Sequence, residues 1–192
     1  MRKTLVLIFL FSVLSGEVMW MENGPGLNAG SNGSGIHWHY GRFPAETYGW
    51  IAEGRLYDLK GENEVPAYDP YSGTVTTAGG ISLVMLTFEG GLMYFPFAGR
   101  IANNFSPYIT FMAGPNIILD APETGSFTER WGQAQTSFGL AVFLGAGISF
   151  YISHQTVFGF SAGYDFLKLP KTIDGKNDYS GLLIKLTYSR RK

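Results

Sequence analysis

Residues 138–152, FGLAVFLGAGISFYI, carry no formal charge and alternate in side-chain character with a period of two. The even positions are all apolar and the odd positions are mostly small or weakly polar: Phe138, Leu140, Val142, Leu144, Ala146, Ile148, Phe150 and Ile152 against Gly139, Ala141, Phe143, Gly145, Gly147, Ser149 and Tyr151. This period indicates a β-strand whose two faces have different surroundings. A membrane-spanning helix would not show it, and the glycines here also count against a helical hairpin.

The same alternation recurs along the chain and predicts seven strands. They cover residues 36–43, 46–58, 81–97, 105–119, 135–152, 156–168 and 179–189. Single-chain bacterial membrane barrels have an even number of strands, so an eighth is expected within residues 17–35. That segment has only a weak pattern, and its glycines are also compatible with a flexible stretch.

Alternation alone does not say which face is buried. A soluble sandwich or lipocalin-like barrel turns its apolar face inward, whereas a membrane barrel turns it toward lipid. The predicted connections alternate between short and long from residue 44 onward, as in outer-membrane barrels with tight periplasmic turns and longer external loops. Residues 131–164 also contain no Asp, Glu, Lys or Arg. We therefore expect an all-β, antiparallel up-and-down transmembrane β-barrel of eight strands.

The composition agrees with this fold and excludes several functions. Charged residues make up 15% of the chain, against about 25% in a typical soluble domain. Mean hydropathy is only +0.05, far below that of a bundle of membrane helices. A net charge of -1 argues against nucleic-acid binding, and the absence of cysteine excludes disulfides and thiolate chemistry.

The N-terminus has the pattern of an export signal. Arg2 and Lys3 precede an apolar run over residues 4–14, and small residues follow at Ser15 and Gly16. This run is too short for a spanning helix, which needs about 20 residues. We expect a signal peptide over residues 1–16, a barrel domain over residues 17–192, and location in the cell outer membrane surrounded by lipid.

An eight-stranded barrel has a lumen filled by side chains. The inward positions predict a polar cluster of Glu53, Arg55, Glu89, Asp165 and Lys185, with His37 and His39 if Trp38 and Tyr40 point outward. Carboxylates and cations in such an interior should pair, because an unpaired buried charge is very costly. A structural role is the preferred interpretation, with a gated solute path or a catalytic site as alternatives. The two histidines are weak evidence for a metal site.

Nine aromatic residues are expected near strand ends or on outer faces, as an interfacial girdle requires. They are Trp38, Tyr40, Tyr48, Trp50, Tyr94, Tyr108, Tyr151, Tyr164 and Tyr188. Sugar-binding platforms are the alternative use. The chain lacks the G-x-S-x-G, P-loop and H-E-x-x-H motifs. We therefore expect no enzymatic activity, no catalytic residues, no cofactor and no metal.

Three motifs over residues 81–189 resemble a known family when taken in order: LTFEGGLMYFPF around Glu89, NNFSPYITFMAGP with Pro107 and Tyr108, and DGKNDYSGLLIKLTY with Asp178 and Tyr179. Together they are similar to small outer-membrane barrels of the OmpA-like superfamily, most of all to the barrel component of the type IX secretion system. The resemblance implies an eight-stranded scaffold barrel without catalytic residues that contacts periplasmic secretion-system proteins. A scaffold role predicts a closed lumen and partner contacts through turns such as AGRIANN. A small-solute transport barrel and a soluble periplasmic lipocalin-like binding barrel are the alternatives.

Overall fold

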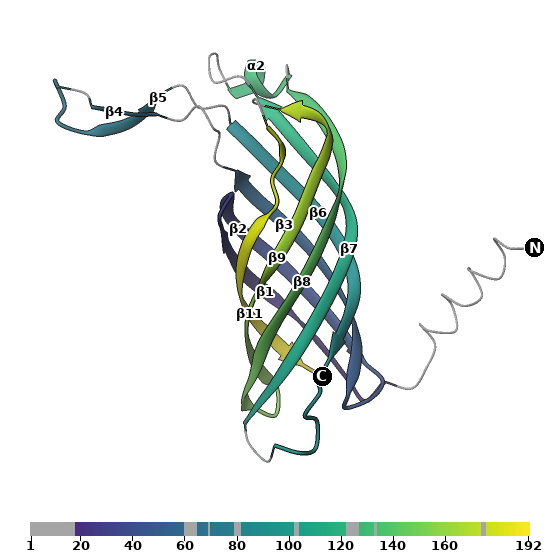
Figure 1. Ribbon diagram of the computed structural model, residues 1–192. Helices are drawn as coiled ribbons and strands as arrows, with labels where there is room; N and C mark the ends of the chain where they lie inside the picture. Colours follow the sequence, from purple (N-terminus) through teal and green to yellow (C-terminus); the bar gives the residue numbers. More distant parts are fainter. Residues whose placement is uncertain are drawn as a thin grey trace, which may run out of the picture.

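The computed structural model describes residues 18–59, 65–68, 70–78, 82–101, 104–121, 127–132, 134–173 and 176–192. Within them, eight long strands wind around a common axis (Figure 1). They are β1 (Trp20–Gly30), β2 (Gly33–Phe43), β3 (Tyr48–Leu59), β6 (Ser82–Tyr94), β7 (Phe105–Ala121), β8 (Gln135–Ser153), β9 (Thr156–Ile173) and β11 (Gly181–Arg191). Each pairs antiparallel with the next along the chain, and β11 pairs with β1.

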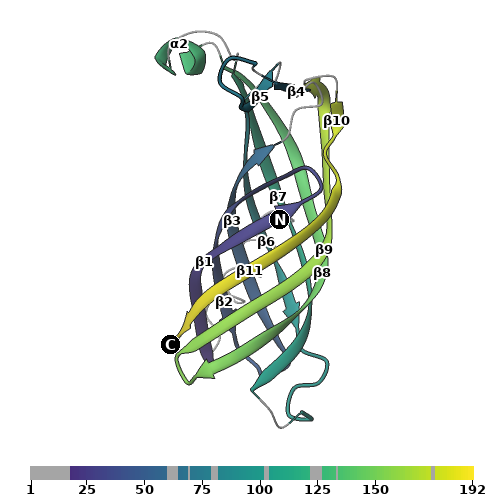
Figure 2. The same ribbon diagram turned by 90° about the vertical axis from the view of Figure 1, so that its left-hand side faces the viewer.

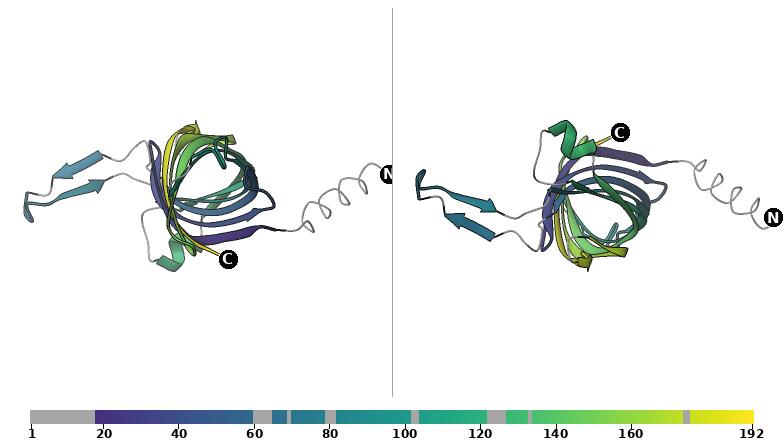
Figure 3. Two further views of the ribbon diagram at one scale, coloured as in Figure 1. Left: turned by 90° about the horizontal axis from the view of Figure 1, so that it is seen from below. Right: turned by 90° about the horizontal axis from the view of Figure 1, so that it is seen from above.

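The pairing of β1 with β11 closes the sheet, which appears as a ring when viewed along its axis (Figure 3). The predicted all-β up-and-down barrel of eight strands is therefore confirmed, and the sandwich and helical alternatives are wrong. No helix within the described residues has the length and apolar character to span a membrane.

The eighth strand, expected within residues 17–35, is a regular one. β1 pairs with β2 along its whole length, from Trp20 opposite Phe43 to Gly30 opposite Gly33. The possible flexible glycine segment is thus a β-hairpin, and β2 begins at Gly33 rather than at residue 36. The glycines weakened the alternation because they lack side chains, yet most of them occupy the inward face of β1 and β2. The predicted signal peptide lies outside the described residues.

The connections differ between the two ends of the barrel. At the lower end in Figure 1, residues 44–47, 95–104 and 154–155 join strands, and β1 starts and β11 ends there. At the upper end lie the tight turn at residues 31–32 and the ends of β3, β7 and β9, after which the next barrel strand begins only at residues 82, 135 and 181. The predicted alternation of short and long connections is confirmed from residue 44 to residue 155. The long connection predicted over residues 169–178 is wrong in its bounds, because β9 continues to Ile173 and residues 176–178 are also strand.

The upper connections contain the remaining elements. β4 (Val65–Tyr68) and β5 (Val75–Ala78) form a separate hairpin that projects sideways from the upper end. The short helix α2 (Phe127–Gly132) lies at the same end (Figure 2), and β10 (Lys176–Asp178) extends the edge of β9.

Candidate functional site

The five charged residues predicted for the lumen all point into the barrel. Glu53 and Arg55 lie on β3, Glu89 on β6, Asp165 on β9 and Lys185 on β11. Each is at most 5% exposed. The closed sheet thus brings these five together in one layer, where their charges must be balanced within the protein.

Arg55 is the centre of one half of this cluster. Its Nη1 donates to Asp165 Oδ2 at 2.9 Å and its Nη2 to Oδ1 at 3.5 Å, and it also forms an ion pair with Glu89. Nη1 further donates to the Tyr57 hydroxyl at 2.8 Å, which lies 3.3 Å from Asp165 Oδ2 and donates to it. The planar guanidinium can bond two carboxylates at once, which a lysine ammonium does less well.

Lys185 is the centre of the other half. Its Nζ lies 2.9 Å and 3.1 Å from the two carboxylate oxygens of Glu53, across the lumen. His39 Nδ1 lies 3.2 Å from the same carboxylate. Glu53 and Glu89 stand directly opposite each other on β3 and β6, and like charges so placed repel. The two cations, each bonded to one of these carboxylates, offset that repulsion.

The ring of Phe143 lies between the two halves. The Lys185 ammonium is 4.2 Å from its centroid and the Arg55 guanidinium carbon is 5.8 Å from it, both within cation–π range. Two glycines make room for this ring. A Cβ at Gly145 would lie 2.6 Å from it and one at Gly163 2.8 Å from it.

The two histidines point inward, and their outward neighbours Trp38 and Tyr40 are exposed. His37 bonds Asn28 Oδ1 through Nδ1 at 2.5 Å and Thr187 Oγ1 through Nε2 at 2.9 Å. Protein groups therefore account for both of its ring nitrogens. Among the described residues, no group of three or more His, Cys, Asp or Glu is placed to hold a metal ion.

Two lumen residues from β1 were missed by the sequence analysis. Glu22 is 6% exposed and accepts a hydrogen bond from the Trp20 indole at 3.1 Å, and Asn28 is 3% exposed. Every second residue of β1 from Trp20 faces inward, so Glu22 and Asn28 both follow the period of two, but the glycines on the same face weaken that signal. The buried charged residues of the described interior are then four carboxylates and two cations: Glu22, Glu53, Glu89 and Asp165, with Arg55 and Lys185. Arg191 is half-buried at the lower end of the lumen.

Aromatic rings fill the lumen below the polar layer. Trp20 stacks on Phe43 with centroids 5.1 Å apart, Phe43 contacts Phe95 at 5.8 Å, and Phe95 meets Tyr108 edge-on at 5.9 Å. The Arg191 guanidinium carbon lies 4.1 Å from the Trp20 ring centroid. Such offset and edge-on contacts are the favoured geometries for aromatic pairs.

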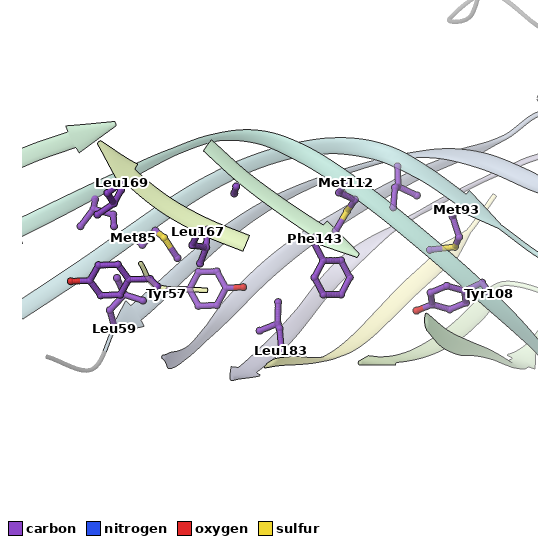
Figure 4. Close-up of a cluster of buried hydrophobic side chains, with 14 of the residues drawn as sticks. Tyr57, Leu59, Met85, Met93, Tyr108, Met112, Phe143, Leu167, Leu169 and Leu183 are labelled. Atoms are coloured by element: carbon purple, nitrogen blue, oxygen red, sulfur yellow. The ribbon is translucent and has the colours of Figure 1, made fainter. Parts of the chain in front are cut away.

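Apolar side chains fill the lumen above the polar layer, and Figure 4 shows several of them, including Leu59, Met85 and Leu167, together with buried apolar residues from lower in the barrel. Those above the polar layer are Leu59, Leu83, Met85, Ile118, Leu167, Leu169, Ile173, Tyr179 and Leu183, each at most 8% exposed. The Tyr179 hydroxyl is satisfied because it donates to the Ile173 carbonyl at 2.9 Å. The lumen therefore has three layers, aromatic, ionic and apolar.

Little space is left between these side chains. One cavity of about 20 Å³ lies beside Glu22, His39 and Glu53, and another of about 20 Å³ lies between Tyr57 and Tyr179. Each is enough for about one water molecule. Neither forms a path along the axis.

The outer surface of the barrel is apolar. The even positions of β8 include Leu140 and Leu144, 60% and 51% exposed, whereas Phe143 is fully buried. Outward aromatic residues from the predicted girdle are exposed at Trp38, Tyr40, Tyr48, Trp50, Tyr94, Tyr164 and Tyr188. Tyr108 was assigned wrongly, since it is 6% exposed and lies in the lumen, and Tyr151 is half-buried. A closed sheet with this exterior is suited to hydrocarbon and not to water.

Comparisons with known proteins find similar folds but no similar sequences. No family model matches the chain, and no curated protein matches it. The solved structure of Neisserial surface protein A is similar with a TM-score of 0.57 and 9% identity, over 90% of this chain and 94% of that one. A major outer membrane protein from Thermus thermophilus has a TM-score of 0.54 and 12% identity, over 90% and 99%. At these identities the likeness shows the fold alone.

Proposed function

We propose that this protein is an integral outer-membrane β-barrel with a structural or scaffold role and a lumen closed to solutes. The observation that carries the proposal is the filling of the described lumen. Four aromatic rings close it below, the pairs of Arg55 and Lys185 cross it in the middle, and apolar side chains close it above. Eight-stranded barrels of this kind are packed structures, not pores.

Three features support the outer membrane as its location. The exterior is apolar and carries interfacial aromatic residues, as transmembrane barrels require. The longer connections are at the upper end of the barrel, opposite to the end where β1 starts and β11 ends. This arrangement matches external loops at the upper end and periplasmic turns at the lower end. The fold is also that of solved outer-membrane proteins. Residues 1–16 would act as the export signal, and the mass of the mature chain from a membrane fraction would identify the cleavage site.

A bilayer measurement tests the closed lumen. The refolded barrel is inserted into a planar membrane, and insertion is verified by the heat-dependent shift in gel migration that closed barrels show. We expect no steady single-channel steps. Steady single-channel conductance steps would instead support the alternative of a small-solute transport barrel, provided that they disappear when an inward glycine is replaced by a larger residue.

The filled interior also bears on the lipocalin-like alternative. A soluble binding barrel needs a ligand cavity, and small-molecule pockets typically measure about 300–1,000 Å³. Two interior cavities lined by described residues measure about 20 Å³ each. The interior of the described strands is therefore built for packing.

A role in protein secretion is the finer part of the proposal, and it rests on the sequence resemblance. Contacts with a periplasmic assembly would be made by the lower turns, where Arg100 and Gly99 are exposed. A photo-crosslinking amino acid at Arg100 should capture a periplasmic secretion component in intact cells. The same probe at Tyr71, in the upper hairpin, is the control. Equal capture at both positions, or capture at neither, would reject this role.

A further inference from the structure

The outer surface of the barrel carries an apolar groove of about 640 Å³. It runs obliquely across strands β9, β11, β1, β2, β3 and β6. Its walls include Trp38, Leu56 and Phe88, and small residues at Pro25 and Gly54 line it between them. A Cβ at Gly54 would meet only the Phe88 ring, at 3.7 Å. The groove therefore exists because a large outward side chain is missing where one would fit.

Cations lie at the lower end of this groove. Tyr188 lines the groove on β11. Arg190 of the same strand and Lys192, just after its end, are both exposed. On the other side of β1, Arg42 of β2 is half-buried and stands opposite Met21. Met21 and Lys192 exchange two backbone hydrogen bonds of 2.9 Å, so the three cations flank the same strand end.

The residues of β1 between these cations carry no acid on the outward face. Asn23 stands opposite both Arg190 and Tyr40, and Met21 opposite Arg42. Tyr40 is 43% exposed and Trp50, opposite Arg42, is 38% exposed. Positive charge beside aromatic residues is the arrangement found at the headgroup level of a membrane.

We propose that the groove and the two exposed cations, Arg190 and Lys192, together bind one anionic phospholipid of the periplasmic leaflet. Arg190 and Lys192 would contact the phosphate-containing headgroup. One acyl chain would lie in the groove between Trp38, Leu56 and Phe88. This inference rests on the proposed insertion of the barrel into the outer membrane, with its lower end in the periplasmic leaflet.

The location of the groove and the charge beside it favour an anionic phospholipid as the occupant. The groove is on the hydrocarbon-facing surface, so its occupant must be apolar along most of its length. The cations are gathered at the lower end of the groove, which matches an amphiphile with a single anionic head. A second copy of the chain would place its own cations beside these in a symmetric contact, which is unfavourable electrostatically.

Native mass spectrometry in detergent micelles tests the proposal. Phosphatidylglycerol and phosphatidylcholine with identical acyl chains are titrated against the refolded barrel. We expect the wild type to retain phosphatidylglycerol preferentially. A surface cation near an anionic bilayer contributes about 1 kcal/mol, or about fivefold. The double variant Arg190→Gln, Lys192→Gln should therefore lose on the order of 25-fold in phosphatidylglycerol binding and little in phosphatidylcholine binding.

A second variant tests the acyl-chain part. Gly54→Leu fills the groove and should weaken binding of both lipids while the headgroup preference is kept. Ala146→Leu adds similar bulk to the outward face of β8, away from the groove, and is the matched control. Lys168→Gln removes an exposed outward cation on β9, toward the opposite end, and is the charge control.

The outcomes separate the lipid site from the barrel proposal. Heat-dependent gel migration establishes which variants are folded barrels. A wild type that never forms a heat-modifiable barrel contradicts the proposed function. A folded wild type without headgroup preference, or a double variant that keeps it, overturns the lipid site alone. A lipid-free dimer that Gly54→Leu dissociates would assign the groove to a second copy and would also overturn the lipid site.

Discussion

The ionic layer of the lumen makes a quantitative prediction for Arg55→Met. This change removes the single cation that bonds both Glu89 and Asp165, which are 3% and 4% exposed. Methionine fills much of the same volume, so the variant isolates the charge from the packing. The two carboxylates and the Tyr57 hydroxyl would all lose a donor.

The expected cost follows from this geometry. Breaking a buried ion pair by removing one partner typically costs about 3–5 kcal/mol. Arg55→Met leaves two carboxylates without their cation and belongs at the upper end of that range. Lys185→Met removes the cation of one carboxylate, Glu53, which retains its contact with His39. We therefore expect it to lower the free energy of unfolding by about 2–3 kcal/mol, near the cost of a lost hydrogen bond to a charged group.

The free energy of unfolding is measured by urea titration of barrels refolded into phospholipid vesicles, followed by tryptophan fluorescence. The triple variant Arg55→Met, Glu89→Gln, Asp165→Asn should recover most of the loss, because no uncompensated charge remains. Lys168→Met, on the exposed outer face of β9, should change stability by less than about 0.5 kcal/mol. A loss below about 1 kcal/mol for Arg55→Met, or no recovery in the triple variant, would refute the reasoning.

Three further predictions use the same unfolding measurement. Leu144→Arg, midway along β8 on the outer face, should cost about 2–4 kcal/mol in lipid; a negligible cost would mean that this face does not meet hydrocarbon. Gly163→Ala should cost about 1–3 kcal/mol in the free energy of unfolding, because its Cβ would lie 2.6 Å from the Gly145 Cα. Gly159→Ala is the control and should change this free energy little, because the nearest neighbour of its Cβ would be 3.5 Å away. Replacing residues 65–78 by a short Gly-Ser linker should leave barrel stability unchanged, since among the described strands β4 and β5 pair only with each other; a large loss would show that the hairpin supports the barrel.

The sequence was sufficient to predict which residues face the lumen wherever one strand face differs clearly from the other. Glu53 and Arg55 alternate with outward Ala52 and Leu56, so the faces of β3 were unambiguous. Lys185 was assigned in the same way on β11. The ion pairs themselves could not be predicted, because Arg55 and Asp165 are brought together across the lumen by the register of strands that are distant in sequence.

The errors came from strands whose faces do not differ in polarity. β7 has apolar residues on both faces, with Tyr108 and Met112 inside and Ile109 and Phe111 outside. Periodicity therefore could not place Tyr108, whereas its register position opposite Gly147, a lumen residue of β8, does. β1 was overlooked for the opposite reason, since glycines on its inner face leave little contrast to detect.

The ionic layer also explains why the barrel has a single register. A slip of one strand by two residues keeps its apolar side chains toward lipid and its small side chains toward the lumen. The contacts of the outer surface with lipid are therefore nearly the same in the two registers. The same slip moves a side chain by about 7 Å along the strand, more than twice the 2.9 Å that joins Lys185 to Glu53. On β9 it would separate Asp165 from Arg55, and on β6 Glu89 from Arg55. Because such a slip of β3, β6, β9 or β11 leaves a buried charge without its partner, and that costs several kcal/mol, the charged residues select one pairing of these strands that the apolar residues alone would leave open.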